Sequence, residues 1–161
     1  KVLRGFDVKI LVYDKYKKDF ESDFIKESSP EEIFLQADVL SLHLPLTDET
    51  NYLVNDAFIG KFKKNIYLIN TSRGQILKTT DLVKNSMSGK ILGACLDVLE
   101  YEASTFEAIS ASSDRQGESS FDYLKSSNKI ILTPHIAGWS FESEKKMANI
   151  LLDKIISFIS K

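Results

Sequence analysis

Five short apolar runs recur along the chain, and longer stretches with helical patterns separate them. The runs are rich in β-branched and aliphatic residues with few polar interruptions, which is typical of strands covered on both faces. They span residues 9–13, 39–44, 66–70, 91–96 and 130–133. We expect these runs to form a parallel sheet.

Amphipathic segments between and after these runs predict helices at 31–36, 55–62, 80–88 and 142–159. Ser29 followed by Pro30 is a helix-start signal, and Gly60 and Gly89 fit helix ends. Alternation of strands with helices predicts an α/β fold. The segment 103–127 is rich in Ser, Glu and Asp, so we expect it to run over the surface, with room for one short helix around 121–124.

Composition narrows the class of protein. A chain of 161 residues suits one domain, and a net charge of -2 gives no electrostatic reason to expect nucleic acid or an anionic membrane as partner. The single cysteine, Cys95, excludes a disulfide framework and a cysteine-based metal site, and its apolar neighbours predict a buried side chain. The sequence contains no apolar run long enough to cross a bilayer, so we expect a cytoplasmic protein. We also expect no bound metal.

Residues that can carry chemistry follow each apolar run. Ligands of doubly wound sheets gather at the carboxyl ends of the strands, so these positions are the candidates for a site. They are Asp14 after the first run, His43, Pro45 and Thr47 after the second, Thr71, Ser72 and Arg73 after the third, Asp97, Glu100 and Glu102 after the fourth, and His135 after the fifth. Each alone has an ordinary explanation as a turn former, a packed histidine or a solvated charge. Together, an arginine, a carboxylate and a histidine suit carbonyl reduction, which needs an anion-binding cation and a proton donor.

Four long motifs carry a family resemblance: "ADVLSLHLPLTDETNYLVN" at 37–55, "INTSRGQIL" at 69–77, "GKILGACLDVLEYE" at 89–102 and "ILTPHIAGWS" at 131–140. The chain resembles the nucleotide-binding domain of the D-isomer-specific 2-hydroxyacid dehydrogenases, and the phosphoglycerate dehydrogenase-like branch looks nearest. The resemblance implies a Rossmann-like doubly wound parallel sheet. It also implies hydride transfer between NAD and a 2-hydroxy or 2-keto acid, with 3-phosphoglycerate as one candidate.

The resemblance also implies catalytic roles. Arg73 would bind the carboxylate and carbonyl of the substrate, His135 would be the general acid/base, and Glu102 would be its carboxylate partner. Glu102 is preferred to Glu100 because it completes the family's Asp-Val-x-x-x-Glu pattern, which begins at Asp97.

The remaining implied roles concern the cofactor. Asp14 would accept hydrogen bonds from the adenosine ribose and favour NAD over NADP, although nearby lysines at 15, 17 and 18 could meet a 2′-phosphate. Asp97 would meet the nicotinamide carboxamide. Around the same cofactor would lie Thr71, His43, Pro45, Thr47 and Gly138.

Two departures from the family pattern bear on these expectations. Ala103 stands where the family usually has proline, and no glycine-rich fingerprint occurs in the 161 residues. The opening "KVLRGFD" matches the end of the helix that follows those glycines. We therefore expect residues 1–161 to be a nucleotide-binding domain fragment without its first strand or its substrate domain, inactive alone, from a homodimeric enzyme. The alternatives are a non-catalytic NAD-sensing or interaction module and an inert fragment.

Overall fold

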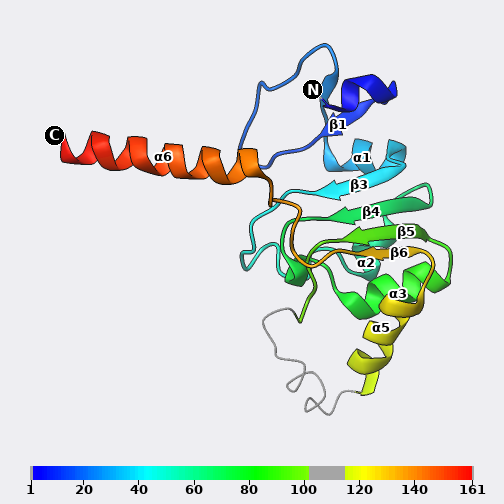
Figure 1. The fold of residues 1–161 in the computed structure, drawn as a ribbon. Coiled ribbons are helices and arrows are strands. Elements are labelled where there is room, and N and C mark those ends of the chain that lie inside the picture. The colour runs from blue at the N-terminus through cyan, green and yellow to red at the C-terminus, as the bar shows by residue number, and fades with distance from the viewer. Residues whose placement is uncertain (1, 102–114, 161) are drawn as a thin grey trace.

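The computed structural model describes residues 2–101 and 115–160 as parallel strands with flanking helices (Figure 1). All five expected strands are present, and two of them have the expected bounds. A separate pair consists of β1 (Ile10–Val12) and β2 (Ile25–Glu27). The main sheet has the order β3 (Val39–Leu42), β4 (Ile66–Asn70), β5 (Ile91–Leu96) and β6 (Ile130–Leu132), with every pair parallel.

The helices follow the expected start and stop signals in most places. They are the 3-10 turns η1 (Val2–Phe6) and η2 (Gly74–Ile76) and the α-helices α1 (Pro30–Gln36), α2 (Asp56–Gly60), α3 (Thr79–Met87), α5 (Arg115–Ser126) and α6 (Phe141–Ile159). The Ser29 hydroxyl accepts a hydrogen bond from the Glu32 amide and caps α1. Gly89 follows α3 with a φ of 80°, a left-handed conformation in which glycine carries no steric cost.

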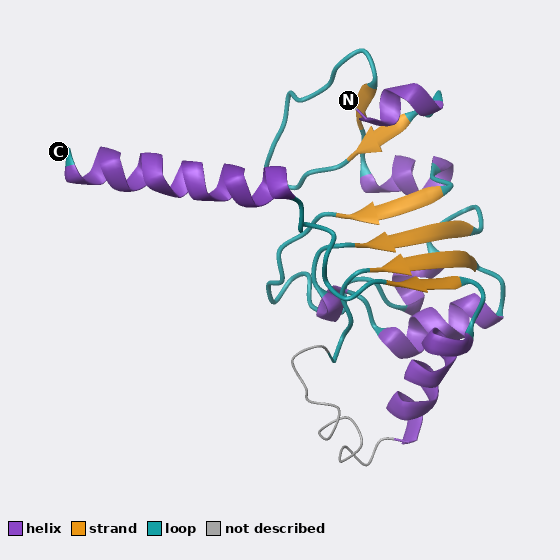
Figure 2. Cartoon of the chain, viewed as in Figure 1, coloured by secondary structure: helices purple, strands orange, loops and turns teal. Residues whose placement is uncertain are grey.

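One face of the main sheet forms the core. Helix α3 packs against β5, and α5 packs against both α3 and β6 on the same side of the sheet (Figure 2). Burial alternates along β4, whereas in β5 the consecutive residues Gly93 and Ala94 are both buried. The buried side chains of the two strands include Ile66, Leu68, Ile91, Ala94 and Leu96. This layer fixes the strands in place and so fixes the positions of the loops that follow them.

The opposite face of the main sheet is not covered by any of the described helices. Tyr67 and Ile131 on this face are 51% and 61% exposed, and Cys95, which pairs with Ile131 in the strand register, is exposed as well. The expectation that both faces are covered, with Cys95 buried, is therefore wrong for the described residues. Cys95 alternates with the buried Ala94 and Leu96, so its side chain points to the open face.

The segment 103–127 also differs from the expectation where the structure describes it. Residues 115–126 form a full helix, in which Leu124 is 2% exposed and the Tyr123 hydroxyl lies 3.0 Å from the Ser86 hydroxyl. The polar composition concealed this helix, and within residues 120–126 only Ser120 and Leu124 are buried. Residues 102–114 lie outside the described part of the chain.

The two sheets are not hydrogen-bonded to each other, so β1 and β3 are both edge strands. Helix α6 leaves the carboxyl ends of the strands and extends away from the sheets, and none of its residues is buried (Figure 1). No helix in the described ranges is long and apolar enough to cross a membrane.

Candidate active site

The loops after β3, β4, β5 and β6 lie on one edge of the main sheet, because parallel strands end at the same edge (Figure 1). Hydrogen bonds join these loops in series. The Ser72 hydroxyl donates to the Leu42 carbonyl at 2.6 Å, and the Asp97 amide donates to the Asn70 carbonyl at 3.0 Å. The His135 amide then donates to the Asp97 carbonyl at 2.9 Å. The candidate residues of this sheet therefore belong to one connected strand-end edge.

Arg73 is held in a tight turn directly after β4. The buried Asn70 side chain fixes this turn, since its Oδ1 accepts from the Ser72 amide and its Nδ2 donates to the Arg73 carbonyl, both at 3.1 Å. Gly74 follows, and a Cβ atom there would lie 1.9 Å from the Leu99 carbonyl oxygen. The Arg73 side chain itself is exposed, with Nη1 donating to the Ser72 carbonyl at 2.6 Å. Its other guanidinium donors can therefore meet an anion at this edge.

Asp97 is buried beneath the loop that carries His135, and it is only 4% exposed. Its Oδ1 accepts from the Thr133 hydroxyl at 2.5 Å and from the Ile136 amide at 2.9 Å, and its Oδ2 accepts from the Ala137 amide at 2.9 Å. Burial acts to raise the pKa of Asp97, but these hydrogen bonds and the nearby His135 outweigh it and lower the pKa overall. Asp97 is therefore an anion at neutral pH.

His135 is exposed and has a φ of 55°, in the left-handed region that a non-glycine residue rarely occupies. Its imidazole is thus presented at the strand-end edge from a constrained backbone, which is the placement expected for a general acid/base.

The Glu100 side chain bonds to the backbone at the start of α3. Its Oε2 accepts a hydrogen bond from the Thr79 amide at 2.8 Å, and α3 begins at Thr79 without a side-chain cap from Lys78. A hydrogen bond to Glu100, together with burial, raises the pKa of the Tyr52 hydroxyl to about 12. Glu100 is therefore engaged by α3 and Tyr52. Glu102, the expected carboxylate partner of His135, lies outside the described residues.

The residues expected near the cofactor after β3 lie in an exposed turn. The His43 Nε2 is 2.9 Å from the Ser41 hydroxyl. The Pro45 carbonyl accepts from the Thr50 hydroxyl at 2.6 Å, and the same hydroxyl oxygen accepts from the Thr47 amide at 2.8 Å. These bonds fix the turn and leave its outer surface accessible.

Two further expected cofactor residues are exposed on the same edge: Thr71 directly after β4, and Gly138 in the turn after His135. A Cβ atom added at Gly138 would meet open space, so the fold of the described residues does not itself require glycine there.

Asp14 follows β1 and has the properties that a ribose-binding carboxylate needs. Its Oδ1 accepts from the amides of Lys17 and Tyr16, both at 2.9 Å, and these bonds lower the pKa of Asp14. Its Oδ2 accepts no hydrogen bond from the described residues, so an ionised oxygen is available to hydroxyl donors. Lys15 forms an ion pair with Glu49 at 2.5 Å, which places the Asp14 segment beside the turn after β3. An ionised carboxylate in this position is what the expected contact with the adenosine ribose requires.

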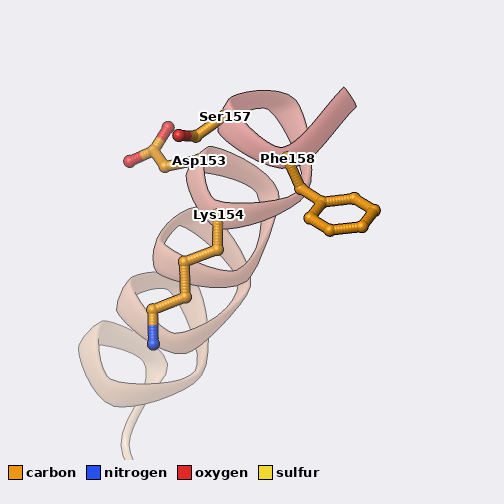
Figure 3. Close-up of a pocket in the computed structure, with 4 residues that line it drawn as sticks. All are labelled: Asp153, Lys154, Ser157 and Phe158. Atoms are coloured by element: carbon orange, nitrogen blue, oxygen red, sulfur yellow. The ribbon is translucent and has the colours of Figure 1, made fainter. Parts of the chain in front are cut away.

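The described surface also has two depressions away from the strand ends of the main sheet, one lined by residues of η1, β1 and β2 and one on α6. A depression on α6 is lined by Asp153, Lys154, Ser157 and Phe158, but these side chains belong to one helix and Phe158 points away from Asp153 (Figure 3). In the described ranges, no group of three or more His, Cys, Asp or Glu side chains could hold a metal ion. The chemistry of the described residues is therefore concentrated at the strand ends.

Comparison with known proteins identifies the family. Residues 1–137 match the model of the D-isomer specific 2-hydroxyacid dehydrogenase, NAD binding domain. The chain belongs to this family. This match confirms three expectations: the family, the Rossmann-like fold and NAD as the cofactor. It does not confirm the expected phosphoglycerate dehydrogenase-like branch of the family.

Individual relatives agree with the family model. An aromatic 2-oxoacid reductase from Clostridium sporogenes is 30% identical over 98% of the chain and 49% of its own length, and a glyoxylate reductase from Thermofilum pendens is 35% identical over 99% and 44%. The solved NAD-complexed D-isomer specific 2-hydroxyacid dehydrogenase from Lactobacillus delbrueckii ssp. bulgaricus gives a TM-score of 0.82 at 27% identity, over 99% of the chain and 48% of its own. The chain spans about half the length of these relatives.

Three residues form hydrogen bonds that could not be assigned from the sequence: Asn70, Glu100 and Thr133. Asn70 is a fully buried polar residue at the end of an apolar run, a pattern that signals a side chain bonded to the backbone. Glu100 and Thr133 bond to partners 21 and 36 residues away in the sequence, and no local pattern reveals such contacts.

Proposed function

We propose that this chain is the nucleotide-binding domain of an NAD-dependent D-2-hydroxyacid dehydrogenase, which works with a separate substrate domain to interconvert a 2-keto acid and a 2-hydroxy acid. The observation that carries the proposal is the shared strand-end edge of Arg73 and His135, whose loops are joined through Asn70 and Asp97. Relatives named for aromatic 2-oxo acids and for glyoxylate support this reaction class. 3-Phosphoglycerate is a further candidate substrate.

In this proposal Arg73 binds the substrate carboxylate and the oxygen of its carbonyl. A guanidinium supplies two parallel donors and stays charged, so it orients the carbonyl and stabilises the negative charge that develops on its oxygen. When bound, NAD would supply or accept the hydride at carbon 2 of the substrate. His135 gives a proton to the carbonyl oxygen during reduction and takes it back during oxidation, and Glu102 holds the imidazole in its protonated form.

The cofactor would lie along the same edge. Asp14 would bind the adenosine ribose hydroxyls through its ionised carboxylate, and Asp97 would reach the nicotinamide carboxamide in addition to its own loop. The remaining contacts would come from His43, Pro45, Thr47, Thr71 and Gly138. Because the glycine-rich loop is absent from the 161 residues, we expect the isolated chain to bind NAD weakly and to be inactive, which calorimetry on a sample of verified mass can measure.

The decisive experiment uses the whole protein with a panel of 2-keto acids that includes pyruvate, glyoxylate, an aromatic 2-keto acid and the oxidised form of 3-phosphoglycerate. His135→Gln should lose roughly 10²–10⁴-fold in turnover, the usual contribution of a positioned acid/base. Arg73→Lys should lose both substrate affinity and rate, because an ammonium cannot reproduce the bidentate guanidinium. Near-normal turnover in His135→Gln would contradict the proposed function.

The pH dependence gives a second test of the same protein. Reduction needs a protonated histidine and should slow as pH rises, whereas oxidation needs the neutral ring and should gain over the same range. Glu102→Gln should move both limbs to lower pH. Homodimerisation and a cytoplasmic location are part of the proposal, and light scattering on the whole protein measures the first.

A further inference from the structure

The Glu100 side chain bonds to two segments that are distant from it in the sequence. Its Oε2 accepts a hydrogen bond from the Thr79 amide at 2.8 Å, at the start of α3. Its carboxylate also accepts a hydrogen bond from the Tyr52 hydroxyl, in the loop between β3 and α2. Glu100 itself lies shortly after β5, so three segments of the strand-end edge meet at one carboxylate.

The loop that contains Tyr52 holds η2, the 3-10 turn that follows Arg73. The Tyr52 amide donates to the Gln75 carbonyl at 2.8 Å, and the Val54 amide donates to the Ile76 carbonyl at 2.9 Å. Tyr52 has a φ of 50°, so its backbone is constrained in a region that non-glycine residues rarely occupy. A side chain that fixes Tyr52 therefore also fixes η2.

The backbone of Arg73 forms the start of η2. Its carbonyl accepts from the Ile76 amide at 3.3 Å and from Asn70 Nδ2 at 3.1 Å. Arg73 is extended, with φ -143° and ψ 140°, and the chain then turns at Gly74, whose backbone lies against Leu99. The direction of the guanidinium therefore depends on the position of η2.

Two kinds of contact join the segment after β5 to the Arg73 segment. The packing of Gly74 against Leu99 limits how closely the two backbones approach, but van der Waals contact is not directional. The hydrogen bonds of Glu100 are directional, and bonds to a carboxylate are stronger than neutral ones. They connect this segment to the loop that supports η2 and to the helix that follows η2.

We propose that Glu100 is a positioning residue, which orients the Arg73 guanidinium toward the substrate carboxylate by holding η2 between the Tyr52 loop and α3. The inference rests on the proposed role of Arg73 and deepens it. It differs from a role as a helix cap alone, because a cap would stabilise α3 without any effect on substrate binding.

The test is Glu100→Ala in the whole protein, which removes both hydrogen bonds. For the keto acid of the panel that the unaltered protein reduces fastest, we expect kcat/KM to fall about 10- to 100-fold, as for a misplaced group. Most of the loss should appear as a higher KM. The dissociation constant for NAD should change much less, because Arg73 is proposed to bind the substrate and not the cofactor.

Two milder variants grade the effect. Glu100→Gln keeps a side-chain oxygen that can accept from both donors, so it should retain most of the activity. Tyr52→Phe removes one of the two donors and should give a smaller rise in KM than Glu100→Ala. Tyr52→Phe also supplies these readouts should Glu100→Ala fail to fold.

A double-mutant cycle shows whether Glu100 acts through Arg73. In the Arg73→Lys background, Glu100→Ala should have little further effect on kcat/KM, since the guanidinium that Glu100 orients is already absent. Asp81→Ala is the matched control, because Asp81 also lies in the first turn of α3 and its Oδ2 accepts from the Asp56 amide at 2.9 Å. It should lower the urea midpoint and leave KM unchanged.

Two outcomes would overturn the inference. One is an unchanged KM in Glu100→Ala together with a lower urea midpoint, which would make Glu100 a helix cap only. The other is an equally large effect of Glu100→Ala in the Arg73→Lys background, which would show that Glu100 acts independently of Arg73. Failure of the proposed function is read separately, from Arg73→Lys alone, because near-normal kinetics of that variant would remove Arg73 from the substrate site.

Discussion

The backbone of Gly74 lies directly against that of Leu99, so that a Cβ atom at position 74 would fall 1.9 Å from the Leu99 carbonyl oxygen. The clash is with backbone, which cannot rotate away as a side chain can. Gly74→Ala should therefore destabilise the chain by about 1–3 kcal/mol or more, the usual range for overpacking, as measured by urea unfolding. Gly60→Ala is the matched control, since a Cβ atom there meets nothing within 4 Å. Equal stabilities of the two variants would contradict the close packing.

The Asp14 carboxylate should determine the choice of cofactor. An ionised Oδ2 attracts the ribose hydroxyls of NAD and repels the 2′-phosphate of NADP, and Lys15 is already paired with Glu49. Asp14→Ala in the whole protein should reduce or abolish the preference for NAD, read as the ratio of kcat/KM for the two cofactors. Asp23→Ala removes another exposed carboxylate between β1 and β2 and should leave the ratio unchanged. An unaltered ratio in Asp14→Ala would remove Asp14 from the cofactor site.

Acid should weaken the contribution of Asp97 to stability. The pKa of Asp97 is lower in the folded chain than its ordinary value of 3.8, so its contribution is fully present above that value. The contribution is lost as pH falls through the still lower folded pKa. Urea midpoints of the unaltered chain and of Asp97→Asn should therefore differ most near pH 6 and converge as pH falls through the lowered pKa of folded Asp97. If the difference between the two urea midpoints does not change with pH, the charge of Asp97 does not contribute to stability.

The Tyr52 hydroxyl should resist ionisation. Its hydrogen bond to Glu100 and its partial burial raise its pKa to about 12, so this contribution to stability is present below the ordinary tyrosine value and is lost as pH rises through about 12. The difference in phenolate absorbance between the unaltered chain and Tyr52→Phe should thus appear only above about pH 11. Glu100→Gln should shift that signal toward the ordinary range near pH 10. If the phenolate absorbance of Tyr52 in the unaltered chain is already complete at about pH 10, the hydrogen bond between Tyr52 and Glu100 is refuted.

Helix α5 should contribute to the stability of the core. Leu124 is 2% exposed and belongs to the main core cluster, so Leu124→Ala should cost about 2–5 kcal/mol in the free energy of unfolding. Leu35 on α1 is 58% exposed, and Leu35→Ala is the matched control with a much smaller expected effect. Similar urea midpoints for the two variants would mean that α5 does not pack on the sheet.

Much of the fold could be read from the apolar runs. The strands at 66–70 and 91–96 have the expected bounds because their runs are long and end in polar residues. Strand β2 was missed because Lys26 and Glu27 make most of this three-residue strand polar. Helix α5 was largely missed because its sequence is mostly polar, and Leu124 is the buried apolar side chain within residues 120–126.

The candidate site was partly predictable for a related reason. Parallel strands place their following residues on one edge, so Arg73, Asp97 and His135 could be assigned to the same edge from their sequence positions. The sequence could not reveal what holds them there. The contacts of Asp97 with Thr133 and of Gly74 with Leu99 join separate loops, and they depend on how the strands are aligned.

The open face of the main sheet makes Cys95 useful as a reporter. It is the single cysteine of the 161 residues, and it lies exposed in β5 beside Ile131. A thiol reagent should label it readily in the isolated chain, and any segment that packs on this face should slow the labelling. The rate of alkylation at one native atom thus measures the coverage of this sheet face in any larger assembly, without the introduction of a foreign probe.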